Sequence, residues 1–118
     1  MKSLNEILEY TFEEKGNCII LILKGTLNIA TVKRLEDAAL KMIAEGKNKF
    51  IIDFKELAFI DSRGLEFFIF LYKKLASVKG TYVVVNLKGF IKDLFDITMV
   101  SSQFKIFESI EEALASLK

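Results

Sequence analysis

A carboxylate and a hydroxyl stand side by side at Asp61 and Ser62, between two apolar stretches of the sequence. The preceding stretch, FIIDF, predicts a buried strand, and the following stretch, LEFFIFLYKKL, predicts a helix. A serine at the start of a helix can accept a hydrogen bond from a backbone amide two or three residues later, and we expect Ser62 to cap the helix in this way. The alternative is that its hydroxyl also carries chemistry.

Three features favour a role for Ser62 beyond capping. Gly64 lies in the first helical turn, where glycine is less stable than alanine by about 1 kcal/mol, and we expect it to leave the backbone around Ser62 open to a partner. Ser62 also follows the carboxyl end of a strand, where open α/β sheets place their sites. The helix is apolar nearly all round, which indicates either packing against a neighbouring helix or contact with another protein.

The sequence lacks the groups that most enzyme and metal sites use. It has no histidine, which excludes Ser-His-Asp and Cys-His systems and histidine-based zinc sites. Its one cysteine, Cys18, excludes cysteine metal clusters and intrachain disulfides and suggests a reducing, cytoplasmic location. No glycine-rich phosphate-binding motif can be written. We expect no enzymatic activity and no cofactor, since a hydrolase built from Asp53, Glu56 and Asp61 lacks an evident nucleophile–base pair.

Charge and hydropathy limit the partners as well. The formal net charge is +1, so neither nucleic acid nor an anionic membrane is an expected partner. The longest apolar runs, CIILIL and FFIFLY, are far shorter than the ~20 residues that span a bilayer. The acidic beginning, MKSLNEILEYTFEEK, is not typical of a signal peptide. We expect a single soluble domain over residues 1–118.

The first third of the sequence predicts a hairpin and a helix. The run CIILIL predicts a buried strand that Gly25 ends, and residues 29–45 have the apolar spacing of a helix with Ile29 on its inner side. A half-exposed strand before them, antiparallel to the buried one, is predicted by alternating apolar residues: Leu8, Tyr10 and Phe12.

The rest of the sequence alternates strands and helices. Strands are expected over residues 49–54, 81–86 and 103–107. One helix is expected from Ser62 to about Val78, and another follows the capping box of Ser109 and Glu112. A short helix between them has four inner residues: Phe90, Ile91, Leu94 and Phe95. The order predicts an α/β domain with a mixed, mostly parallel five-stranded sheet, its first strand antiparallel, and about four helices.

The sequence around Ser62 resembles a known family. Residues 60–65, IDSRGL, match a pattern of an apolar residue, Asp, Ser, a variable residue, Gly and Leu. This pattern is found in the STAS domain, specifically in bacterial anti-sigma factor antagonists. The segments GTLNIATVKRLEDAA and IKDLFDITMVSSQFKIFESIEEAL are similar to other parts of the same family, in the same order. The resemblance therefore covers nearly the whole chain.

This resemblance implies indirect regulation of transcription through protein–protein contacts. In the family, the serine after the aspartate is phosphorylated by a partner that is both a serine kinase and the anti-sigma factor, which implies a phosphorylation site at Ser62. The antagonist binds this partner when unphosphorylated and is released on phosphorylation. A serine phosphatase is a further implied partner, and we expect a monomer or a weak homodimer. The implied partner-binding residues are Asn28, Asp61, Arg63, Gly64, Leu65 and Glu66.

Two of these residues depart from the family pattern. Asn28 stands where many members carry Asp in the loop that faces the phosphorylation site, so the position keeps its hydrogen-bonding ability and loses its charge. Glu66 stands where glycine is frequent, and it adds an acid near the site. Both changes bear on which partner is bound.

Two other functions remain open. A STAS domain can serve as an accessory subunit of a transporter, or as a stressosome component, without being phosphorylated. A response-regulator receiver would use Asp53 as its phosphate acceptor, but no acids for magnesium follow the strongest early strand and the two-strand opening does not match. We expect the Asp53 carboxylate to accept hydrogen bonds from loop amides.

Overall fold

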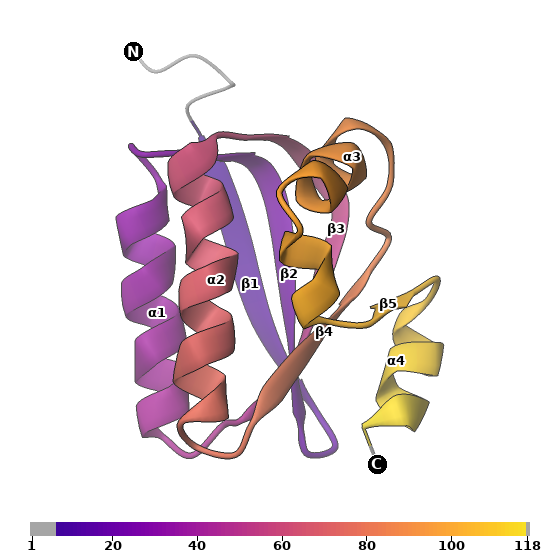
Figure 1. Cartoon of the computed structure of the whole chain (residues 1–118). Helices are drawn as coiled ribbons and strands as arrows, with labels where there is room; N and C mark the ends of the chain where they lie inside the picture. Colours follow the sequence, from indigo (N-terminus) through magenta and orange to yellow (C-terminus); the bar gives the residue numbers. More distant parts are fainter. Residues whose placement is uncertain (1–6, 118) are drawn as a thin grey trace.

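The order of strands and helices in the computed structural model is the predicted one, with one additional 3-10 helix, η2. Residues 7–117 are described, and residues 1–6 and Lys118 of the expected domain lie outside the described residues. The elements are β1 (Leu8–Lys15), β2 (Cys18–Leu27), α1 (Val32–Ala44), β3 (Lys49–Ile60), α2 (Ser62–Ala76), β4 (Thr81–Val85), α3 (Gly89–Ile97), η2 (Val100–Gln103), β5 (Ile106–Phe107) and α4 (Ile110–Ser116) (Figure 1).

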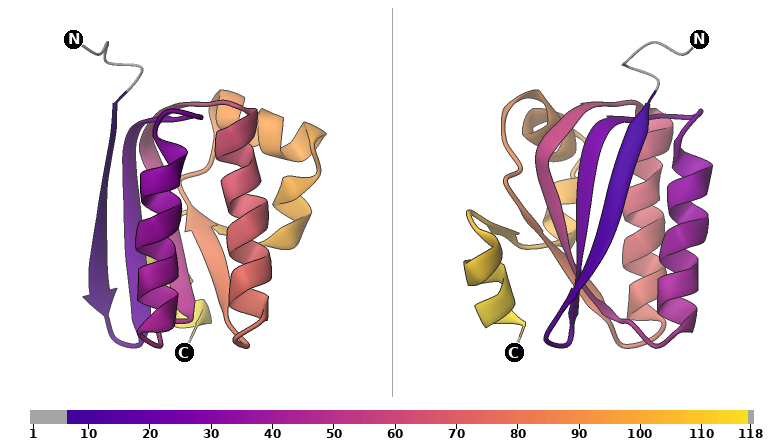
Figure 2. Two further views of the ribbon diagram at one scale, coloured as in Figure 1. Left: turned by 90° about the vertical axis from the view of Figure 1, so that its left-hand side faces the viewer. Right: turned by 180° about the vertical axis from the view of Figure 1, so that it is seen from behind.

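The five strands form one sheet in the order β1-β2-β3-β4-β5. β1 is antiparallel to β2, and the remaining neighbours are parallel, which confirms the predicted mixed, mostly parallel sheet (Figure 2). The carboxyl ends of parallel strands meet at the same edge of a sheet. Leu27 at the end of β2 is paired with Ile60 at the end of β3, so the loops that follow these two strands are neighbours.

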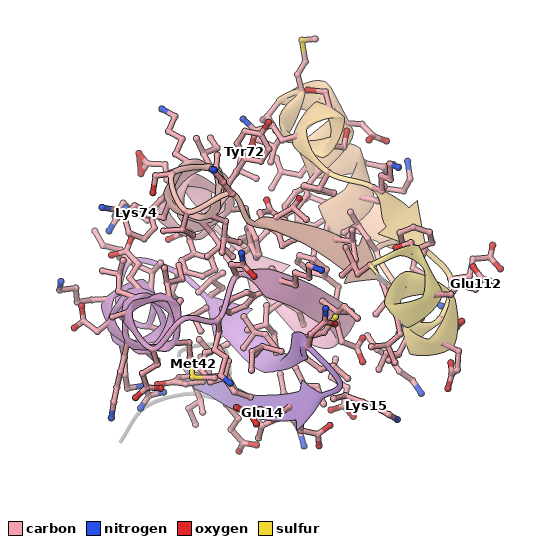
Figure 3. All side chains as sticks on the ribbon, turned by 90° about the horizontal axis from the view of Figure 1, so that it is seen from below. Glu14, Lys15, Met42, Tyr72, Lys74 and Glu112 are labelled. Atoms are coloured by element: carbon pink, nitrogen blue, oxygen red, sulfur yellow. The ribbon has the colours of Figure 1, made fainter. Side chains whose placement is uncertain are left out.

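Helices cover both faces of the sheet (Figure 3). α1, α2 and α3 contribute to the larger core on one face, and α4 packs on the other face. The alternation of side chains along β3 shows why both faces are covered. Phe50 and Ile52 belong to the larger core, whereas Ile51 packs in a smaller cluster with Ala113 of α4. No helix within residues 7–117 combines the length and the hydropathy needed to cross a membrane.

Aromatic side chains fill the core beneath α2. The ring of Phe68 lies 5.2 Å from that of Phe54 in β3 and 5.4 Å from that of Phe95 in α3, measured between centroids. The hydroxyl of Tyr82 in β4 donates to the main-chain oxygen of Phe68 at 3.0 Å, and burial raises the pKa of this phenol. Packing within the chain therefore accounts for most of the apolar residues of α2, although Tyr72 is 38% exposed. Four of them are fully buried: Phe67, Phe68, Leu71 and Leu75.

Two expectations about the helices are wrong. α1 begins at Val32, because residues 28–31 form a hydrogen-bonded turn, and Ile29 is 71% exposed instead of facing inward. In α3, Ile91 and Phe95 are buried as predicted, since residues four apart share one face of a helix. Phe90 lies on the outer side of this helix and is 62% exposed.

The strand boundaries also differ from the prediction. β3 continues past residue 54 to Ile60. β5 covers only Ile106–Phe107, since Gln103 ends η2 and the next two residues belong to neither element. Gly25 does not end β2, which continues to Leu27. Its φ of +102° lies at a shift of register between β2 and β3, and a Cβ atom there would overlap the main-chain oxygen of Ile7.

Gly25→Ala should lower the free energy of unfolding by about 2–4 kcal/mol, because it adds backbone strain and a clash with Ile7. Gly46→Ala is the matched control: its φ is +94°, and a Cβ there meets no atom within 4 Å. The control should lose only about 1–2 kcal/mol, the strain of a positive φ. Urea unfolding of the two variants measures the difference, and equal losses would contradict the close contact between Gly25 and Ile7.

Candidate functional site

Asp61, rather than Ser62, caps α2. Asp61 has an extended backbone, with φ −105° and ψ −174°, and its Oδ1 accepts a hydrogen bond from the amide of Gly64 at 2.8 Å. Ser62 is the first helical residue, and its side chain is exposed. The expectation that Ser62 caps the helix is therefore wrong, because a cap residue must have a non-helical backbone. Among the described residues, no hydrogen-bond partner of the Ser62 hydroxyl is found.

The second carboxylate oxygen of Asp61 holds the loop between β2 and α1. Its Oδ2 accepts from the amide of Ile29 at 3.1 Å, across 32 residues of sequence. The amide of Asp61 donates to the main-chain oxygen of Leu27 at 3.2 Å. Asn28 lies in the same loop, and its side-chain oxygen accepts from the amide of Ala30 at 3.0 Å. Asn28, Asp61 and Ser62 are thus brought together at one edge of the sheet, where α1 and α2 both begin (Figure 1).

Gly64 and Leu65 lie beneath this surface. Gly64 is buried, and a Cβ atom there would lie 2.7 Å from Cγ1 of Ile60 and overlap the main-chain oxygen of Leu27. The glycine therefore allows α2 to approach β2 closely, whereas the expectation was that it leaves the surface around Ser62 open. Leu65 is part of the larger core. Gly64 and Leu65 therefore support the surface around Ser62 through buried packing.

Arg63 lies between two glutamates. Its Nη1 is 3.3 Å from Oε2 of Glu66 in the same helix, and its Nη2 is 3.9 Å from Oε2 of Glu36 in α1. The side chains of Arg63 and Glu66 are 40% and 59% exposed, so this pair contributes little to stability. The Glu36 side chain is only 16% exposed, and its distance to Arg63 is the longer one. The acidic residues outnumber the basic one at this end of α2, since the Asp61 carboxylate is also close.

Ile29 and Glu36 were not predicted as site residues. Ile29 was assigned to the inner side of a helix, although Asn28 and Thr31 are typical turn-forming residues three apart. That spacing could have indicated the turn, since the Asn28 side chain accepts from the Thr31 amide at 3.2 Å. Nothing in the sequence indicated the contact of Glu36 with Arg63, because it joins two helices.

The other candidate residues and hollows lie elsewhere. Asp53 was expected to accept from loop amides. It accepts at 2.9 Å from the amide of Lys55, which lies within β3, and at 2.9 Å from the side chain of Asn86, which follows β4. Hollows of about 400 and 430 Å³ lie along β4 and β5, and neither is lined by residues of α2.

Within residues 7–117, no three His, Cys, Asp or Glu side chains are grouped so that they could hold a metal ion. The site around Ser62 is a surface that another protein can reach.

Separate substitutions of Asp61 and Ser62 should show which of the two residues stabilises the start of α2. Asp61→Ala should lower the free energy of unfolding by about 1–2 kcal/mol, because the Gly64 amide and the Ile29 amide both lose their acceptor. Ser62→Ala should change it by less than about 0.5 kcal/mol, because Ser62 is exposed and alanine favours the helix. Urea unfolding measures both changes. A larger loss for Ser62→Ala than for Asp61→Ala would contradict the assignment of the cap.

Comparisons with known proteins agree with this arrangement. The family model of the STAS domain matches residues 9–113. A relative from Bordetella bronchiseptica, which carries the name of an anti-sigma factor antagonist, BtrV, is 28% identical over 111 residues. The match covers 94% of this chain and 96% of the relative.

Solved structures show the same fold. An anti-sigma factor antagonist from Mycobacterium paratuberculosis has a TM-score of 0.86 at 20% identity, covering 98% of this chain and 97% of that one. The phosphorylated form of the Bacillus cell fate determinant SpoIIAA has a TM-score of 0.76 at 20% identity, covering 93% of this chain and 100% of that one. The chain belongs to the STAS domain family, and the relatives that it resembles over nearly its whole length include anti-sigma factor antagonists.

Proposed function

We propose that this protein is an anti-sigma factor antagonist that is switched by phosphorylation of Ser62. The observation that carries the proposal is an exposed serine at the first position of α2 whose hydroxyl is not used as the helix cap. Because Asp61 supplies the cap, the Ser62 hydroxyl can be modified without removing a bond that begins the helix. The family to which the chain belongs supports the same role.

In the unmodified state, the surface around Ser62 binds a partner that is both an anti-sigma factor and a serine kinase. Asn28, Arg63 and Glu66 supply the polar contacts of this surface, and Asp61 holds its loop and its helix in position through two hydrogen bonds. Gly64 and Leu65 act through the packing beneath it, because both are buried. The kinase supplies ATP and its metal ion, so this protein needs no cofactor and has no enzymatic activity of its own.

Phosphorylation leaves the fold intact. A phosphate adds about −1.5 to −2 charges. At the N-terminus of a helix, negative charge is favourable by up to ~1 kcal/mol, because the amide groups of the first turn point toward it. The modified hydroxyl also lies outside the core, so no packing contact is lost.

The same phosphate weakens binding to the partner. The unmodified surface already carries the carboxylates of Asp61 and Glu66, and its one guanidinium, Arg63, is shared with Glu66 and Glu36. If Arg63 turns to the phosphate, Glu36 and Glu66 lose their basic partner. The surface therefore becomes more negative whichever group Arg63 pairs with. Burying this charge against an interface that fitted a neutral hydroxyl costs about 2–5 kcal/mol, which is enough to release the partner. A serine phosphatase would restore binding.

Incubation with purified anti-sigma factor kinases from the same organism, with ATP and magnesium, should phosphorylate the wild-type protein at Ser62. Mass mapping of the modified peptide identifies the residue. The Ser62→Ala protein is the control and should remain unmodified, because its fold is unchanged and only the acceptor is missing. Phosphate on another serine would overturn the assignment of Ser62.

Binding of the same kinase is the second measurement. Ser62→Ala should bind like the unmodified wild type, and Ser62→Asp should bind at least about tenfold more weakly, because even one negative charge disturbs the interface. Equal binding of the two variants would contradict a switch by charge. Isothermal titration calorimetry distinguishes these outcomes.

A further inference from the structure

Ile29 is a large apolar side chain exposed at the edge of the sheet where α2 begins. It is 71% exposed, in the loop between β2 and α1. Single exposed apolar residues are common in folded proteins and need no explanation by themselves. Ile29 differs because the loop that carries it is fixed by hydrogen bonds on both sides and is tied to the helix of Ser62.

Hydrogen bonds within the loop fix its conformation. The side-chain oxygen of Asn28 accepts from the amides of Ala30 at 3.0 Å and Thr31 at 3.2 Å. The hydroxyl of Thr31 donates to the main-chain oxygen of Thr26 at 2.9 Å and accepts from the amide of Asn28 at 3.0 Å. A loop held in this way loses little conformational entropy when it binds a partner.

A bond from a distant element fixes the position of Ile29 relative to Ser62. The amide of Ile29 donates to Oδ2 of Asp61 at 3.1 Å, and Asp61 directly precedes Ser62. The other oxygen of Asp61 is bound to the amide of Gly64 in α2. One carboxylate thus holds the loop and the helix together, and it places the backbone of the exposed Ile29 beside the residue that precedes Ser62.

We propose that Ile29 is the apolar anchor of the surface around Ser62, and that it inserts into an apolar recess of the anti-sigma factor that binds there. This inference rests on the proposed function, because it takes the same partner. The exposed charged residues of the surface gain little on pairing, whereas a rigidly held apolar side chain gains affinity when it is fully buried. Most of the binding energy of an interface comes from a few such residues. Asp61 is a positioning residue for this anchor.

Ile29→Lys tests the anchor, with Val78→Lys as the matched control. Val78 is 43% exposed and lies just beyond the C-terminus of α2, at the opposite end of this helix from Ser62. With the purified kinase that phosphorylates Ser62, Ile29→Lys should raise the Kd about 10- to 100-fold, the effect of losing a buried isoleucine. Val78→Lys should change the Kd less than twofold. Circular dichroism and urea unfolding check that both variants are folded.

The results distinguish a failure of the Ile29 anchor from a failure of the proposed function. If wild type binds and Ile29→Lys binds within twofold of it, the anchor is overturned and the proposed function stands. If wild type binds none of the anti-sigma factor kinases, the proposed function is overturned and the anchor with it. If Ile29→Lys leaves kinase binding unchanged and instead dissociates a homodimer, measured by sedimentation, the occupant is a second copy and the proposal is wrong.

Asp61→Asn tests the positioning role. Asparagine is as good a helix cap as aspartate, but it has one acceptor oxygen in place of two, so the bond to Ile29 or to Gly64 is lost. Faster amide hydrogen exchange at Ile29 would show that the loop has been released. The increase in Kd caused by Asp61→Asn should nearly vanish in the Ile29→Lys background, because the anchor is already gone. An equal increase in both backgrounds would show that Asp61 contacts the partner itself, and would overturn its positioning role.

Discussion

The surface around Ser62 depends on the carboxylate of Asp61. One of its oxygens accepts from the amide of Gly64 and begins α2, and the other accepts from the amide of Ile29 in the loop before α1. An aspartate used as a cap normally satisfies amides of its own helix. Here the same group also orders a loop from a distant part of the chain. The start of the helix with the exposed hydroxyl and the neighbouring loop are therefore joined through one carboxylate.

The sheet and the helix packing make this bond possible. β2 and β3 are parallel neighbours, and Leu27 pairs with Ile60, so the loops that follow both strands lie together. Gly64 lets the first turn of α2 come so close to the main-chain oxygen of Leu27 that no other side chain would fit. The close approach places the first turn of α2 beside the end of β2, from which the loop of Ile29 continues.

The residues that stabilise α2 are different from the residue proposed to be phosphorylated. The aromatic core beneath α2 holds the helix in place through buried contacts, such as those between Phe68, Phe54 and Phe95. The hydroxyl of Ser62 is outside this core and outside the cap, so a change in its charge acts on what binds the surface and leaves the packing unchanged. Asp53, the acceptor that a receiver domain would need, accepts hydrogen bonds from the amide of Lys55 within β3 and from the side chain of Asn86 after β4.

Sequence alone determined the order of the elements, the mostly parallel sheet with its antiparallel first strand, and the position of the serine at the start of a helix. These features follow from local periodicity and from a short motif, which residues close in sequence define. The sequence did not show which of two adjacent residues caps α2, why Gly64 is required, that β2 continues through Gly25, or that Ile29 is exposed. The cap is a local bond between Asp61 and Gly64, and either of two adjacent polar residues could form it until the backbone at Asp61 is seen to be extended. Only the tertiary structure decided the other three, because they depend on contacts between distant parts of the chain: Asp61 with Ile29, Gly64 with Leu27, and Gly25 with Ile7.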